Sequence, residues 1–112
     1  MSPDKQLAVA FASRKLESDF EELNAGKFED KALYGFINRA ISDLKKDASC
    51  GIKMPKKLWP KEYKQYALTN LWKYDLPNGW RLIYTIKENA VMILSVILEW
   101  FCHKDYEKRF KY

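Results

Sequence analysis

One arginine in this sequence is well placed to hold a phosphate group. Residues Trp80 to Lys87 alternate in the period of a β-strand, directly after the turn-forming run Pro77-Asn78-Gly79. Successive side chains of a strand point to opposite faces, so Arg81 should lie on the face opposite Trp80. Its guanidinium offers a planar fork of donors that can bind a phosphate with two hydrogen bonds. The alternative is a surface arginine whose stem covers part of the sheet.

The only histidine, His103, follows the last predicted strand. An imidazole changes its charge near neutral pH, which suits proton transfer during catalysis. A lone histidine beyond a strand end can equally be a surface or capping residue, so both roles stay open for His103.

A basic and aromatic connector runs from Ala48 to Tyr66. Lysines neutralise phosphates and aromatic rings stack on bases, so this composition suits RNA. In the alternative interpretation, Trp59 and Tyr63 fill one end of the core and the lysines are simply solvated. The candidate RNA-binding lysines are Lys53, Lys56, Lys57 and Lys61.

Other enzyme signatures are missing from the sequence. It has no metal-ligand cluster, phosphate-binding glycine loop or Ser/His/Asp set. Cys50 and Cys102 lie far apart without CxxC or Cys/His ligand spacing, so we expect reduced, non-catalytic thiols. We therefore predict neither a metal nor a cofactor.

Length and composition predict one domain over residues 1–112. The chain has 112 residues, is 47% hydrophobic and carries a formal charge of +5, which favours an anionic partner. It has no run of about 20 apolar residues and no signal-like start at Met1 to Asp4. We expect a cytoplasmic protein without a membrane partner.

The first half of the chain should supply a strand and two helices. Leu7, Val9 and Phe11 alternate with smaller or polar residues, as in a strand. A first helix is expected over Arg14 to Ala25, with Ser13 as its cap and Gly26 ending it in the left-handed conformation. A second is expected over Phe28 to Asp47, and the short loop predicts an antiparallel hairpin.

The second half should supply the sheet. Turn signals at Pro77-Asn78-Gly79 and Glu88-Asn89 separate three predicted strands. A helical turn is also expected, and a short terminal helix that packs against the sheet edge. The order is β-α-α-β-β-β, an α+β fold in which a helical hairpin packs on a small antiparallel sheet. The strands are Leu68 to Leu76, Trp80 to Lys87 and Ala90 to Phe101, and the helical segments are Pro60 to Gln65 and His103 to Tyr112.

Two segments carry a family resemblance. The stretch from Asn70 to Ile86, NLWKYDLPNGWRLIYTI, resembles the strand, turn and Gly-aromatic-Arg-aliphatic-aliphatic-Tyr core of the RelE/ParE toxin superfamily. The ending His103 to Lys108, HKDYEK, looks like the His-x-x-Tyr-Glu close of RelE- and HigB-like members. The resemblance implies a toxin of a type II toxin–antitoxin pair, an endoribonuclease that cuts messenger RNA on the ribosome without a metal. Its implied partners are a cognate antitoxin protein, the ribosome and mRNA.

The resemblance also implies residue roles. Arg81 matches the phosphate-holding arginine of the family. Tyr106 matches the terminal tyrosine that helps to position the base or the attacking ribose. Lys73 aligns with a basic position that supports cleavage, although a salt bridge or plain solvation would also account for it.

The sequence departs from the family at two acidic positions. Relatives carry further basic residues on the second and last strands, where this chain has Asp75 and Glu99. Glu99 would serve as a general base or balance the charge of Arg81, and we favour the second role. The alternatives for the whole chain are a superfamily member that acts by binding, as a ParE-like DNA gyrase inhibitor or an inactive interaction module, and a generic RNA-binding domain.

Overall fold

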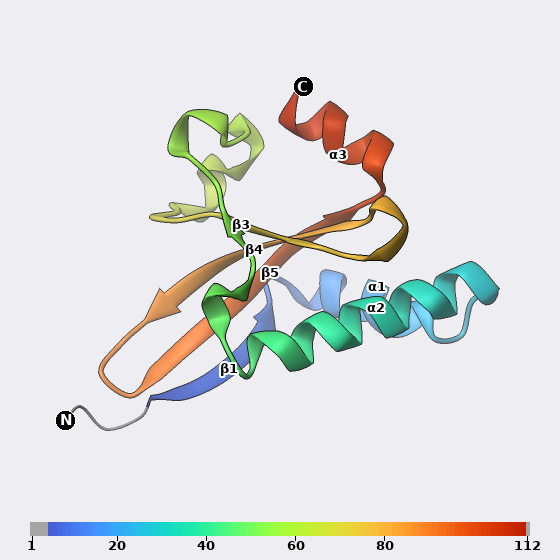
Figure 1. The fold of residues 1–112 in the computed structure, drawn as a ribbon, viewed down its shortest axis with the longest axis horizontal. Coiled ribbons are helices and arrows are strands. Elements are labelled where there is room, and N and C mark those ends of the chain that lie inside the picture. The colour runs from blue at the N-terminus through green and yellow to red at the C-terminus, as the bar shows by residue number, and fades with distance from the viewer. Residues whose placement is uncertain (1–4, 112) are drawn as a thin grey trace.

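The computed structural model describes residues 5–111, in which one five-stranded sheet carries helices on both faces (Figure 1). The predicted α+β class and the two-helix hairpin are confirmed. None of the helices in these residues is long and apolar enough to cross a membrane. The strands are β1 (Gln6–Phe11), β2 (Ile52–Lys53), β3 (Trp72–Asp75), β4 (Arg81–Glu88) and β5 (Met92–Phe101), and the α-helices are α1 (Arg14–Leu23), α2 (Phe28–Leu44) and α3 (His103–Phe110).

The sheet is mixed, so the prediction of an antiparallel sheet was wrong. Its strand order is β1-β5-β4-β3-β2, and β1 runs parallel to β5 while the other neighbours are antiparallel. Parallel neighbours need a long crossover between them, and here the whole chain between β1 and β5 supplies it. The two-residue strand β2 was also missed, because Gly51 and Pro55 leave too short a run between them to show a strand period.

The first helix of the hairpin begins at the predicted cap, but Gly26 does not have the predicted conformation at its end. The Ser13 hydroxyl accepts a hydrogen bond from the Leu16 amide at 3.1 Å, which satisfies one free donor of the first turn of α1. Gly26 does not adopt the left-handed conformation, since Gly79 alone among the glycines has a positive φ. A side chain at Gly26 would instead collide with Asp30, as its Cβ would lie 2.3 Å from the Oδ2 atom.

The helices pack on one face of the sheet and form the larger core. The apolar stripe of α2 lies against side chains of β4 and β5 that point to the same side. This face carries Leu82 and Tyr84 of β4, as the predicted alternation required. The buried members of this core are Phe20, Leu33, Ile37, Ala40, Leu44, Leu76, Leu82, Tyr84 and Ile97.

The opposite face is covered by the later part of the connector, from Met54 onward, and by α3 (Figure 1). The predicted helical turn is present as a 3-10 helix at Lys61–Tyr66, and the predicted terminal helix is α3. It packs on the sheet face and not on the sheet edge, because its apolar residues meet the central strands β4 and β5. Tyr112 lies outside the described residues. The buried members of this second core are Met54, Tyr63, Leu71, Ile83, Leu98, Tyr106 and Phe110.

The turn before β4 confirms the predicted turn signal. Asn78 and Gly79 adopt left-handed backbone conformations, with φ of 60° and 80°. Such conformations favour asparagine and glycine, and they reverse the chain within a few residues. As a result Arg81, the first residue of β4, lies directly opposite Asp75, the last residue of β3.

Tyr84 ties the sheet to the segment after α2. Its buried hydroxyl donates a hydrogen bond to the Ala48 carbonyl at 2.8 Å and accepts one from the Gly51 amide at 3.1 Å. The Tyr84→Phe variant would leave both backbone groups without this partner, so we expect it to unfold about 1–3 kcal/mol more easily in urea. Tyr34→Phe keeps a ring that stacks on Phe20 and serves as a control, with an expected change below about 0.5 kcal/mol. Equal losses for the two variants would contradict this role of Tyr84.

Candidate functional site

The structure brings together three of the four predicted catalytic residues, on the sheet face that α3 covers. Arg81 from β4 and Lys73 from β3 both lie over the ring of Tyr106 from α3. The guanidinium carbon of Arg81 is 5.6 Å from the ring centroid, and the Nζ atom of Lys73 is 5.7 Å from it. Cations at this distance are attracted by the negative face of an aromatic ring. The pair is therefore held at one place above the sheet.

Tyr106, which both cations contact, is itself buried. It is 2% exposed, and its ring stacks on Phe110 with a centroid separation of 4.6 Å. A ring enclosed in this way has little surface to offer a base, so the geometry favours a supporting role. The role that the resemblance implies, positioning the base or the ribose, stays a prediction.

Asp75 completes the cluster, since its carboxylate lies between the two cations. This role was not predicted from the sequence. One carboxylate oxygen, Oδ1, lies 2.9 Å from Nε of Arg81 and 3.3 Å from Nζ of Lys73. The prediction that Glu99 balances Arg81 is therefore wrong, because Asp75 does so. Sequence reasoning recorded Asp75 only as a departure from the family, although the tight turn after it should have indicated a position opposite Arg81.

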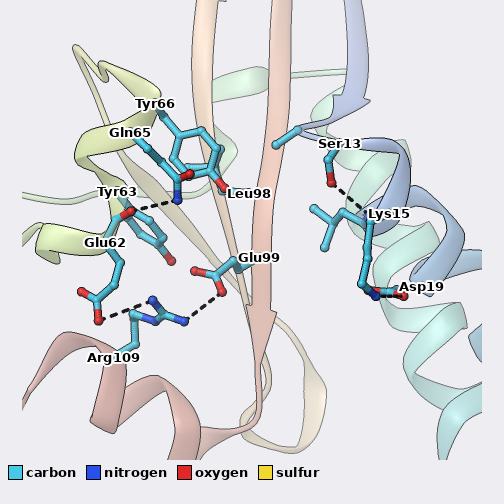
Figure 2. Close-up of a pocket in the computed structure, with 12 residues that line it drawn as sticks. Ser13, Lys15, Asp19, Glu62, Tyr63, Gln65, Tyr66, Leu98, Glu99 and Arg109 are labelled. Atoms are coloured by element: carbon cyan, nitrogen blue, oxygen red, sulfur yellow. Dashed lines mark hydrogen bonds and ion pairs between the residues drawn. The ribbon is translucent and has the colours of Figure 1, made fainter.

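Glu99 belongs to a neighbouring group of charges. Its carboxylate pairs with the guanidinium of Arg109 at 3.2 Å, and Arg109 also approaches Glu62 at 3.5 Å. Figure 2 shows these side chains, with Tyr63, around a cavity of about 500 Å³ between the connector, β5 and α1. Burial, with the adjacent negative charge of Glu99 as a second cause, raises the pKa of Tyr63 well above its usual range.

A β-bulge explains why Glu99 faces this cavity. Ile83 is paired with Glu99, but the next residue, Tyr84, is paired with Ile97, so Leu98 is an extra residue in β5. A bulge sets two residues of one strand against one residue of its neighbour. Leu98 and Glu99 therefore both line the cavity on the α3 side.

His103 stands apart from the two cations. Its side chain is 63% exposed, and its Nε2 atom lies 2.7 Å from a carboxylate oxygen of Glu107, one turn along α3. A Cβ atom at Gly79 would lie 3.2 Å from that of His103, so the start of α3 rests against the turn that precedes Arg81. The start of α3 therefore brings His103 close to the turn before Arg81, but its imidazole pairs with the carboxylate of Glu107.

The four candidate lysines of the connector are all exposed. The aromatic residues beside them help to fill the core, as the alternative interpretation held. Tyr63 is 3% exposed, and the indole nitrogen of Trp59 donates a hydrogen bond to the Met54 carbonyl at 3.0 Å. Lys56, Lys57 and Lys61 come from the part of the connector that lies on the α3 side of the sheet, with Arg81 (Figure 1). Lys53 lies in the edge strand β2 and is paired with Trp72, so its register places it on the opposite face.

The thiols take no part in the cluster of cations. Cys50 is exposed, Cys102 is partly buried, and neither forms a disulfide. Within residues 5–111, no three His, Cys, Asp or Glu side chains converge as ligands for a metal ion.

Tyr74 links α2 to β3 near the site and predicts an alkaline transition. Its hydroxyl donates a hydrogen bond to the Asp43 carboxylate, and burial together with this bond raises its pKa from near 10 to about 12. Between these values the unfolded chain loses the proton and the folded chain keeps it, so stability should fall as the pH rises from 10 to 12. Urea unfolding across this range should show a smaller decline for Tyr74→Phe than for the wild type. An identical decline would contradict this assignment.

Comparisons of this chain with models of protein families, with curated proteins and with solved structures found no match in any of the three. Its function must therefore be inferred from its own side chains and from their arrangement.

Proposed function

We propose that this chain is a RelE-like toxin of a type II toxin–antitoxin pair, an endoribonuclease that cuts messenger RNA on the ribosome. One observation carries the proposal: Arg81 and Lys73 lie together over Tyr106. Their side chains are 19% and 20% exposed, so they are partly desolvated yet still reachable by a ligand. Partial desolvation strengthens the attraction between fixed cations and a phosphate.

The proposed chemistry uses the RNA itself as the nucleophile. The ribose 2′-hydroxyl releases its proton to solvent water as its oxygen attacks the adjacent 3′-phosphate. A 2′,3′-cyclic phosphate forms, the bond from phosphorus to the 5′-oxygen breaks, and that oxygen takes up a proton. Negative charge grows on the phosphate oxygens in the transition state, where Arg81 and Lys73 would stabilise it. His103 is the candidate proton donor to the departing oxygen, provided that its imidazole leaves Glu107 when the substrate binds.

The proposed partners follow from the charge of the connector and from the family resemblance. Exposed lysines of the connector would contact ribosomal RNA, with an affinity that falls as salt rises. A cognate antitoxin would restrain the toxin by lying across its helices or its sheet.

The test is a brief induction of the wild-type chain and of Arg81→Ala in bacterial cells. New mRNA 5′ ends on translating ribosomes would then be mapped. We expect ends phased to codons with the wild type and none with Arg81→Ala. Growth arrest with intact messages would contradict the nuclease proposal.

A second candidate is a superfamily member that acts by binding alone. Two contacts favour it: Asp75 already occupies Arg81, and Glu107 already occupies His103. A ParE-like member of this kind would block DNA gyrase, so purified protein should stop gyrase supercoiling without cutting RNA. Salt-dependent RNA binding without growth arrest would indicate a generic RNA-binding domain. The absence of activity in all of these assays would indicate an inactive interaction module.

A further inference from the structure

We propose that the Asp75 carboxylate occupies the phosphate position between Lys73 and Arg81, and that an incoming phosphate group must displace it. That the group is an RNA phosphodiester rests on the proposed function. That an anion competes with Asp75 rests on the geometry of the three side chains alone.

The first argument is the shared oxygen. Nε of Arg81 and Nζ of Lys73 approach the same Oδ1 atom, at 2.9 and 3.3 Å. The contact with Arg81 is an ion pair without an aligned hydrogen bond from Nε, so charge and distance define the position. A phosphate oxygen carries charge of the same sign and would be attracted to the same place. Asp75 thus marks where a phosphate oxygen would sit.

The second argument is the unequal burial of the partners. The Asp75 side chain is 46% exposed, whereas those of Arg81 and Lys73 are 19% and 20% exposed. Both cations also contact the Tyr106 ring, and these contacts would keep them in place after the carboxylate leaves. Ion pairs with such an exposed partner contribute little net stability, so Asp75 can be displaced at small cost. It is also the last residue of β3, where the turn begins.

The third argument is the local charge. Lys73, Arg81 and Asp75 together carry one net positive charge, and a displaced Asp75 would remain close enough to repel a bound anion. The acid should therefore weaken binding of isolated anions. A substrate that is held by further contacts, as mRNA would be on a ribosome, is less affected. Asp75 would in this way restrict the site to substrates that are also held by contacts elsewhere.

A competing explanation is that Asp75 only orients Arg81 for binding. The two explanations predict opposite results when the charge of Asp75 is removed. If Asp75 competes with the ligand, Asp75→Asn should bind anions more tightly. If Asp75 only positions Arg81, the same variant should bind them more weakly.

The experiment is a titration with sulfate at constant ionic strength, followed by the NMR signal of the Arg81 Nε–Hε group. We expect Asp75→Asn to bind sulfate roughly three- to tenfold more tightly than the wild type, because one repulsion and one competing ion pair are lost. Asp75→Ser should show the same direction of change. Glu21→Gln removes one negative charge from an exposed position of α1, and this variant should bind sulfate as tightly as the wild type does.

A double variant locates the effect. Sulfate binding, followed by the remaining signals around the site, should show no gain when Asp75→Asn is combined with Arg81→Ala. The proposal is overturned if Asp75→Asn binds sulfate no more tightly than the wild type, or if Glu21→Gln increases the affinity for sulfate as much as Asp75→Asn does. It is also overturned if neither the wild type nor any of the variants shows sulfate binding at Arg81. The readout needs neither a ribosome nor cleavage. If Asp75→Asn binds sulfate more tightly but the wild type cuts no mRNA, the proposed nuclease is rejected and the anion site is kept. If the wild type cuts mRNA but Asp75→Asn binds sulfate no more tightly, the competition by Asp75 is rejected and the nuclease is kept.

Discussion

If the chain is the proposed nuclease, replacing Arg81 with alanine should slow its mRNA cleavage on programmed ribosomes by about 10²- to 10³-fold, the usual loss when one donor to a developing negative charge is removed. Arg81 directly follows the turn, is partly buried and lies over Tyr106, so its guanidinium is held in place at the proposed site. The rate would be measured in single turnovers with purified protein and ribosomes that carry a defined message.

Two further variants separate charge from geometry. Arg81→Lys keeps the charge but not the fork, and it should recover only a small part of the rate. Lys87→Ala removes an exposed cation from the same strand and the same face, and its rate should match that of the wild type. If Arg81→Ala keeps more than about a third of the wild-type rate, Arg81 does not hold the reacting phosphate.

The largest expected loss of stability comes from Leu82→Ala. Leu82 is 0% exposed in the core between the helices and the sheet, next to Arg81 in β4. Removing its buried methyl groups and leaving a cavity should lower the free energy of unfolding by about 2–5 kcal/mol. Urea unfolding followed by circular dichroism would measure this difference.

Leu58 offers a matched control for this substitution. It is 37% exposed in the connector, so Leu58→Ala removes the same atoms from a position that solvent already reaches. We expect a loss well below that of Leu82→Ala, of about 1 kcal/mol or less. Similar losses for the two variants would mean that Leu82 is not the core residue that its burial indicates.

The local periodicity of the sequence is enough to assign many side chains to the correct face of their strand or helix. The alternation in β4 placed Leu82 and Tyr84 on one face and Ile83 on the other, and the two cores divide in that way. The helical repeat of α2 identified Leu33 and Ile37 as core residues. These patterns are reliable in a regular strand or helix, because the face of a side chain there follows from the period of its own element.

The strand neighbours could not be obtained from these patterns. An apolar alternation in β1 requires a buried face, but it is equally satisfied beside a parallel or an antiparallel partner. The pairing of β1 with β5 depends on how the helical hairpin returns the chain, which is a property of the whole fold. The two residues of β2 are too few to show any period.

The site shows the same division between local pattern and tertiary contact. The sequence alone was enough to select Arg81, Lys73 and Tyr106 as candidates, because their residue types and spacing carry the family resemblance. It could not assign partners to Asp75 and Glu99. Those partners depend on strand register, on the bulge at Leu98 and on where α3 crosses the sheet, each of which sets distances between residues far apart in the chain. Charge attraction acts over these distances in space and not along the sequence, so only the folded chain decides which acid meets which base.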